Sequence, residues 1–261
     1  MSEDPTFETG QDPPPADLAV DRDTPLETVS VRREPIWGWA DVGLFFGLGL
    51  PTLLVAQLVV VLMAGAFGAK HDNPFVLVAG QAVAYALLFT LLALILRVQY
   101  SAPFWSTLGW RQGRIQPGTA ALCGVVLAFS IALLGGLLHV PDVESPMQKL
   151  LRTPHGLLVL SLFGTTVGPV AEELAFRGFL QPLLVRNLGA VPGILIAAFA
   201  FGLLHLSQNA GSWPHIALIS LAGIGFGVLR QVSGSTQTSI LAHAAYNLTL
   251  FVAFFAGRNT R

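Results

Sequence analysis

The chain has 261 residues, of which 53% are hydrophobic and only 11% are charged, and its formal net charge is −1. A soluble globular domain carries about 25% charged residues, so this composition excludes a protein whose whole surface faces water. It indicates an integral membrane protein, for which we expect the lipid bilayer and no nucleic acid as a partner. The single cysteine, Cys123, excludes a disulfide within the chain.

Residues 1–35 differ from the rest of the sequence. They hold nine of the fifteen acidic residues, are rich in proline and contain few large apolar side chains. Such a segment buries too little apolar surface to offset its chain entropy, and it lacks the basic start and apolar core of a signal peptide. We expect a disordered acidic tail, then a transmembrane domain at 36–256 and a short C-terminal tail at 257–261.

The remainder is a series of apolar blocks. A helix that crosses the hydrocarbon core needs about 20 apolar residues, so the blocks predict an all-α, polytopic bundle of about seven to eight spans around an internal cavity. The candidate spans are about 42–67, 74–96, 118–140, 157–186, 190–208, 213–231 and 237–256. The five tryptophans fall at or between block ends, as in an interfacial aromatic belt. The short segments 103–111 and 145–152 are expected at the interface.

Basic residues set the expected orientation. With the N-terminus inside and seven spans, eight arginines fall in inside segments and five basic residues fall in outside segments. The sequence therefore predicts a multi-pass protein of the cell membrane with a cytoplasmic N-terminal tail.

The stretch 168–180, GPVAEELAFRGFL, places three charges in an otherwise apolar span. A charge at mid-membrane costs at least about 2.5–3.5 kcal/mol, so it indicates a functional site. Glu173 and Arg177 are four residues apart and pair on one helix face, whereas Glu172 points about 100° away. Pro169 removes a backbone hydrogen bond and predicts a kink. A purely structural ion pair accounts for Glu173 and Arg177 but leaves Glu172 without a partner, so we expect Glu172 to face a water-accessible cavity.

Two later spans each carry polar residues one helical turn apart. Phe201 precedes His205 in one span, and His243 precedes Asn247 in another. Taken alone, His205 has a simple explanation as a helix-end residue, and the second pair as an interhelical hydrogen bond. Taken with a glutamate, they form a set that activates water. A carboxylate accepts the proton, histidine orients or relays it, and asparagine donates to an oxyanion.

The ordered motifs E-E-x-x-x-R, F-x-x-x-H and H-x-x-x-N resemble those of the CPBP (Abi) family of intramembrane proteases, which includes the CAAX prenyl endopeptidase type. The resemblance covers about residues 118–256, with the motifs at 172–247. It implies hydrolysis of a peptide bond in a membrane-anchored, in some cases prenylated, protein. It also implies that Glu172 and His205 activate water and that His243 and Asn247 stabilise the oxyanion. The supporting positions are Glu173, Arg177 and Phe201.

Other functions stay open at this stage. Glu172, His205 and His243 are also the ligand set of a zinc protease with water as fourth ligand. We nevertheless expect no metal or cofactor, because Glu173 is needed to neutralise Arg177 and no further carboxylate remains to act as base. A membrane scaffold or immunity protein without chemistry is a third possibility, and a transporter is a fourth. The confinement of the intramembrane charges to the C-terminal half favours one catalytic site.

Overall fold

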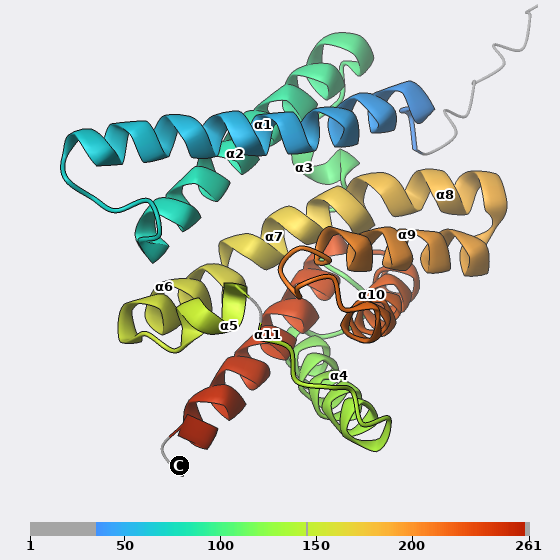
Figure 1. The fold of residues 1–261 in the computed structure, drawn as a ribbon. Helices are drawn as coiled ribbons and strands as arrows, with labels where there is room; N and C mark the ends of the chain where they lie inside the picture. Colours follow the sequence, from blue (N-terminus) through green and yellow to red (C-terminus); the bar gives the residue numbers. More distant parts are fainter. Residues whose placement is uncertain (1–34, 145, 259–261) are drawn as a thin grey trace, which may run out of the picture. The chain divides into compact units, whose positions relative to one another are not determined.

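In the computed structural model, the described residues are 35–144 and 146–258, and they form helices without any β-strand (Figure 1). The elements, in chain order, are α1 (Trp39–Ala66), α2 (Pro74–Leu94), a π-helical turn (Ile95–Gln99), α3 (Phe104–Thr107), α4 (Pro117–Leu137), α5 (Pro146–Leu151), α6 (Pro154–Thr165), α7 (Val167–Glu173), a second π-helical segment (Leu174–Leu180), α8 (Gln181–Leu188), α9 (Ala190–Leu204), α10 (Trp213–Ser233) and α11 (Thr236–Arg258). The expected tail at 1–35 lies outside the described residues except for its last residue, and α11 extends beyond the expected end at 256.

Proline marks several helix starts. Helices α2, α4 and α6 begin at Pro74, Pro117 and Pro154, where the missing N–H is not needed because amides of the first turn have no partner within the helix. The side chains of Asn73 and Thr153 cap α2 and α6 by accepting hydrogen bonds from first-turn amides, each at 3.0 Å. The turn residues in the sequence therefore fix where these helices begin.

Six helical segments within the described part are long and apolar enough to cross a membrane: 39–66, 74–99, 117–137, 154–188, 213–233 and 236–257. The exposed side chains of α1 indicate the environment of these segments. In this helix, Leu50, Leu54, Leu58 and Leu62 lie one turn apart and are 57–65% exposed. An apolar stripe of this kind would be unfavourable in water but matches lipid hydrocarbon. The chain is an integral, multi-pass membrane protein.

The expected span at 190–208 is a shorter helix than predicted. Helix α9 ends at Leu204 after 15 residues, and turns follow it. At about 1.5 Å per residue, it is shorter than the hydrocarbon core on its own. Its first residues nevertheless lie at the N-terminal end of α1, because Arg186 just before it donates a hydrogen bond to the backbone carbonyl of Trp37 at 3.4 Å.

Two further contacts join the ends of other helices to segments far away in the sequence. The Tyr100 hydroxyl, after α2, donates to Asp41 at the start of α1 at 2.6 Å. Burial and the neighbouring Asp41 raise the pKa of Tyr100 to about 12, so the hydroxyl keeps its proton at neutral pH. After α10, the hydroxyl of Thr236 donates to the carbonyl of Leu108 at 2.6 Å. Helix α9 is not among the six segments that are long enough to cross a membrane, so a seventh pass stays a prediction.

The expected span at 157–186 is a broken helix. Its interruption lies at Thr166, whose φ of −122° and ψ of −83° are not helical. Pro169 explains the position, because a proline ring clashes with the carbonyl four residues earlier, here that of Thr165, the last residue of α6. The chain then winds as a π-helix over Leu174–Leu180, and all seven residues of that segment are buried. π-Helical turns are rare and occur frequently at functional sites.

The aromatic-belt prediction is wrong for one of the five tryptophans. Trp37 is buried, its ring lies 5.1 Å from that of Phe179, and its indole N–H donates to the Phe179 carbonyl at 3.0 Å. By contrast, Trp39, Trp105 and Trp213 are each more than half exposed. Proximity to a span end does not distinguish a tryptophan at the lipid interface from one that packs inward. Trp37 holds the start of α1 against the π-helical segment.

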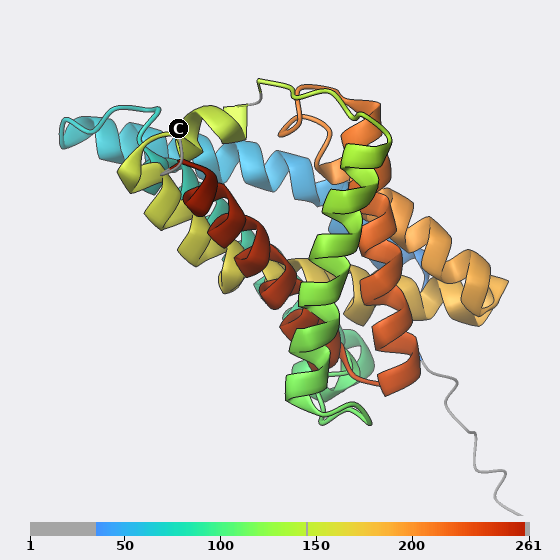
Figure 2. The same cartoon turned by 90° about the horizontal axis from the view of Figure 1, so that it is seen from below.

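Helix α4 packs along α11 and also contacts α10 (Figure 2). The approach is closest at Gly124, which is buried. A Cβ atom added there would lie 2.0 Å from the backbone carbonyl oxygen of Ala242 in α11. Glycine is therefore required at this crossing, as at other close helix contacts in membranes.

Replacing Gly124 by alanine is expected to destabilise the protein by about 1–3 kcal/mol, because neither backbone can yield without separating α4 from α11. Gly136→Ala is the matched control, since the same helix offers that Cβ open space with no atom within 4 Å. Thermal unfolding of both variants in the same detergent checks the prediction. Equal midpoints for the two variants would contradict it.

Candidate active site

A stripe of buried polar side chains runs along the broken helix and faces α10. Glu173, Arg177 and Gln181 follow one another at intervals of four and are 0–2% exposed. Arg177 pairs with Glu173 at 2.9 Å and donates to the Gly223 carbonyl at 2.7 Å, and Gln181 donates to the Gly227 carbonyl at 3.0 Å. A Cβ at Gly223 would meet the guanidinium at 3.2 Å. Glycines on α10 thus leave room for these polar side chains. The predicted pair of Glu173 and Arg177 is present.

Aromatic rings enclose the Arg177 guanidinium. Its central carbon lies 4.6 Å from the ring centroid of Phe201, 5.4 Å from that of Phe226 and 6.0 Å from that of Phe176. Rings at these distances attract a cation through their quadrupoles while excluding water. Phe201, predicted as a supporting residue, takes this position on α9. The charge of Arg177 is therefore held by one carboxylate, one carbonyl and three ring faces.

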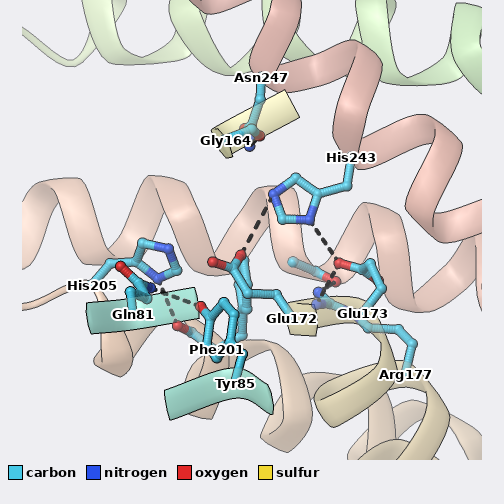
Figure 3. Close-up of polar contacts among 11 residues, drawn as sticks. Gln81, Tyr85, Gly164, Glu172, Glu173, Arg177, Phe201, His205, His243 and Asn247 are labelled. Atoms are coloured by element: carbon cyan, nitrogen blue, oxygen red, sulfur yellow. Dashed lines mark hydrogen bonds and ion pairs between the residues drawn. The ribbon is translucent and has the colours of Figure 1, made fainter. Parts of the chain in front are cut away.

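His243 of α11 lies between the two adjacent glutamates (Figure 3). Its Nδ1 is 2.9 Å from Oε1 of Glu173, and its Nε2 is 3.8 Å from Oε2 of Glu172. Because an ionised carboxylate only accepts hydrogen bonds, Nδ1 carries a proton and Nε2 points towards Glu172. The imidazole stacks on Phe226 at 4.5 Å and meets the edge of Phe201 at 5.7 Å. Phe226 and Phe201 thus fix the orientation of the His243 ring.

The two glutamates have different surroundings, although they are neighbours in the chain. The side chain of Glu173 is fully buried, whereas that of Glu172 is 22% exposed and makes only the longer 3.8 Å contact with His243. The environment therefore separates a carboxylate held by Arg177 and His243 from one that remains accessible. This difference in orientation is the one expected from their positions on a helix.

His205 follows directly after α9 and is half-buried. Its Nδ1 lies 3.0 Å from the backbone carbonyl of Phe201. Because a carbonyl oxygen only accepts, Nδ1 is the donor, and in the neutral ring Nε2 keeps its lone pair as an acceptor. Figure 3 shows His205 on the flank of Glu172 opposite His243. Helix α9 thus presents a basic nitrogen near the accessible carboxylate.

Asn247 is on the same helix as His243 but is directed elsewhere. Its side-chain amide donates to the backbone carbonyl of Gly164 at 2.7 Å, near the end of α6 (Figure 3). It thereby satisfies a carbonyl group left without a helical partner where α6 breaks. In this structure one amide N–H of Asn247 holds the broken helix against α11, which is a role that its spacing from His243 does not predict.

An apolar groove of about 500 Å³ lies between α6 and α11, beside the Asn247 contact. It is lined by Pro154, Leu157, Leu158, Ser161, Leu248, Phe251, Val252 and Phe255. Over the described residues, no three His, Cys, Asp or Glu side chains are grouped as metal ligands would be. The alternative zinc set of Glu172, His205 and His243 is not such a group in this structure.

The motifs miss two polar residues of the site that lie on α2. Tyr85 and Gln81 are joined by a hydrogen bond of 2.8 Å from the Gln81 amide to the Tyr85 hydroxyl. Figure 3 shows both residues beside Glu172 and His205. Their spacing is itself a signal, since Gln81 and Tyr85 are one turn apart in a span that is otherwise apolar. The same criterion that singled out His243 and Asn247 also selects this pair.

The comparisons with known proteins agree with the motifs. Residues 154–249 match the family model described as type II CAAX prenyl endopeptidase Rce1-like. No curated protein and no solved structure matches the chain. The matched segment runs from the start of α6 into α11 and contains every residue of the three motifs. The resemblance seen in the sequence is confirmed: residues 154–249 form a domain of the Rce1-like family of type II CAAX prenyl endopeptidases.

Proposed function

We propose that the protein is an intramembrane endopeptidase in which Glu172 activates water to hydrolyse a peptide bond of a membrane-associated protein. The observation that carries the proposal is the contrast between two adjacent carboxylates. Glu173 is fully buried and held by Arg177 and His243, whereas Glu172 is 22% exposed and held only at 3.8 Å. A base must reach a water molecule, and of the two carboxylates only Glu172 is accessible.

The charges of the site balance when His243 is protonated. Glu172 and Glu173 then contribute two negative charges, and Arg177 and His243 contribute two positive ones. A buried, low-dielectric site favours such a neutral set, because each unpaired ion carries a large desolvation cost. Protonated His243 donates from Nδ1 to Glu173, and its Nε2–H points towards Glu172 and the space beside that carboxylate. It therefore supplies the positive donor that a developing oxyanion requires.

The reaction then proceeds by proton transfers through Glu172. The carboxylate takes one proton from water while the water oxygen forms a bond to the substrate carbonyl carbon. The carbonyl oxygen becomes an oxyanion, which the Nε2–H of His243 stabilises. The C–N bond breaks when Glu172 returns the proton to the leaving amine. His205, whose Nε2 is an acceptor, orients the water from the other flank, as the family resemblance implies.

The apolar lining of the groove and its position support the proposal of a membrane-associated substrate. It lies between α6 and α11, and its lining begins one residue after Asn247, at Leu248. Apolar lining of this kind suits the hydrophobic part of a membrane-anchored chain, such as a lipid group near the cleaved bond. We propose a CAAX-type, prenylated protein as the substrate class, in line with the family to which residues 154–249 belong.

Purified protein in detergent is expected to cleave a farnesylated CAAX-type peptide and to cleave the same peptide without its lipid less well. We also expect activity to survive exhaustive dialysis against a chelator, because Glu172, His205 and His243 are not grouped as metal ligands. Mass spectrometry of the products and elemental analysis of the same sample check both points. Activity lost on chelation and restored by one zinc ion per chain would replace the proposed mechanism.

The proposed topology places the N-terminal tail in the cytoplasm and the C-terminus outside. It takes α9 as a seventh pass beside the six long segments, and the basic residues favour an inside N-terminus. In a Cys123→Ala background, Gly10→Cys is expected to resist an impermeant thiol reagent in intact cells, whereas Gly257→Cys reacts. Labelling at position 10, or equal behaviour at both positions, would contradict this arrangement.

A further inference from the structure

We propose that Tyr85 of α2 is a further catalytic residue of the site, whose hydroxyl donates a hydrogen bond to the substrate carbonyl oxygen as that oxygen becomes negative. The inference rests on the proposed hydrolytic function and adds a residue that lies outside the family-matched segment 154–249. Three observations support it: where Tyr85 lies, what its hydroxyl is bonded to, and what holds its ring.

The first observation is the position of Tyr85 relative to Glu172. Figure 3 shows Tyr85 beside Glu172, on the flank that also carries His205 and Gln81. The hydroxyl lies close enough to Glu172 for the carboxylate charge to act on it, yet the two residues are not directly hydrogen-bonded. A substrate carbonyl group that lies next to Glu172, where water can attack it, therefore comes within reach of the phenol. Tyr85 and His243 approach that point from α2 and α11, on opposite flanks of the carboxylate.

The second observation is the direction of the hydrogen bond to Gln81. An amide nitrogen only donates, so Gln81 Nε2 donates to the Tyr85 oxygen at 2.8 Å. The phenolic proton is not used in that bond, and none of the described residues accepts it. Donation from Gln81 also polarises the hydroxyl and strengthens the bond that its own proton makes. The hydroxyl is therefore oriented by one partner and available as a donor to another.

The third observation is that the Tyr85 side chain is held rigidly. The Tyr85 ring stacks on Phe163 of α6, with centroids 6.1 Å apart and planes inclined by 15°. With the ring held by Phe163 and the oxygen held by Gln81, little reorganisation is needed when charge develops. Preorganised donors of this kind account for a large part of oxyanion stabilisation. Asn247, which the family resemblance assigns to the same task, already uses one of its amide protons on Gly164.

The test compares Tyr85→Phe with Tyr100→Phe in the purified full chain, using the farnesylated CAAX-type peptide. Tyr85→Phe keeps the ring on Phe163, so we expect kcat to fall by about 10²–10³-fold with KM nearly unchanged. A peptide phosphonate of the same sequence, which mimics the oxyanion, is expected to bind more weakly by a similar factor. Tyr100→Phe removes a hydroxyl outside the site and is expected to leave kcat unchanged.

The outcomes separate this inference from the proposed function. Cleavage that requires Glu172 but has equal kcat in Tyr85→Phe and Tyr100→Phe would overturn the role of Tyr85 alone. No cleavage by the wild type would overturn both proposals. If Tyr85→Phe does not fold, Gln81→Leu carries the test. It leaves the tyrosine unoriented, so a lower kcat at unchanged KM supports the inference, and the wild-type kcat overturns it.

Discussion

Replacing Glu172 by glutamine is expected to reduce hydrolysis by a factor of about 10²–10⁴, equivalent to roughly 3–5 kcal/mol of activation free energy. Glutamine has nearly the same shape as glutamate but cannot accept the proton of the attacking water. The fold is expected to persist, because Glu172 is partly exposed and its contact with His243 is long, at 3.8 Å. Activity and thermal stability, measured on the same preparation, check both parts of the prediction.

Glu173→Gln is the matched control, since it makes the same change one residue later. It removes the carboxylate that pairs with Arg177 and accepts from His243, both at 2.9 Å. This variant is therefore expected to lose stability as well as activity. A Glu172→Gln protein with wild-type turnover would exclude Glu172 as the base.

Arg177→Met is expected to destabilise the protein by about 3–5 kcal/mol, because it leaves Glu173 charged and without its guanidinium partner in a site that excludes water. The double variant Glu173→Gln with Arg177→Met removes both charges. We expect it to be more stable than Arg177→Met alone, although it still lacks the hydrogen bond to Gly223. Detergent-induced unfolding of the wild type, both single variants and the double variant gives the interaction free energy.

Arg152→Met supplies the comparison for an exposed pair. Arg152 and Glu144 also form an ion pair at 3.0 Å, but their side chains are 65% and 60% exposed. Solvent screens such a pair, and its loss is expected to cost at most about 1 kcal/mol. If Arg177→Met were no more destabilised than Arg152→Met, the buried pair would not be the structural centre of the site.

Most of the helices could be predicted from the sequence because lipid imposes a length of about 20 apolar residues on each crossing. Interruptions of a helix could also be predicted where the sequence shows a local cause, as at Pro169. The sequence did not predict the shortness of α9, which was expected to extend over 190–208 but ends at Leu204. Nor did it predict that Trp37 packs inward, since burial depends on which helix lies beside it.

Some features of the candidate site could likewise be predicted from the sequence, and others could not. Pairing of Glu173 with Arg177 and the separate direction of Glu172 are consequences of helix geometry and were visible in the spacing. The partners of His243 and Asn247 are tertiary, so spacing within α11 could not identify Glu173 or Gly164 as those partners. Tyr85 carries no charge and belongs to none of the three motifs. Its spacing from Gln81 is a signal in the sequence, but only the structure places it beside Glu172.

The partners of Glu173 also differ in when they become available during synthesis. Arg177 is four residues away, so it is synthesised almost together with Glu173, and the pair needs no other segment of the chain. His243 is 70 residues further along the chain, and at about 5–20 residues per second it emerges roughly 4–14 s later. Until α11 is inserted, the carboxylates have no imidazole between them. On the proposed function, a newly made chain therefore acquires its hydrolytic site only when its last helix enters the membrane.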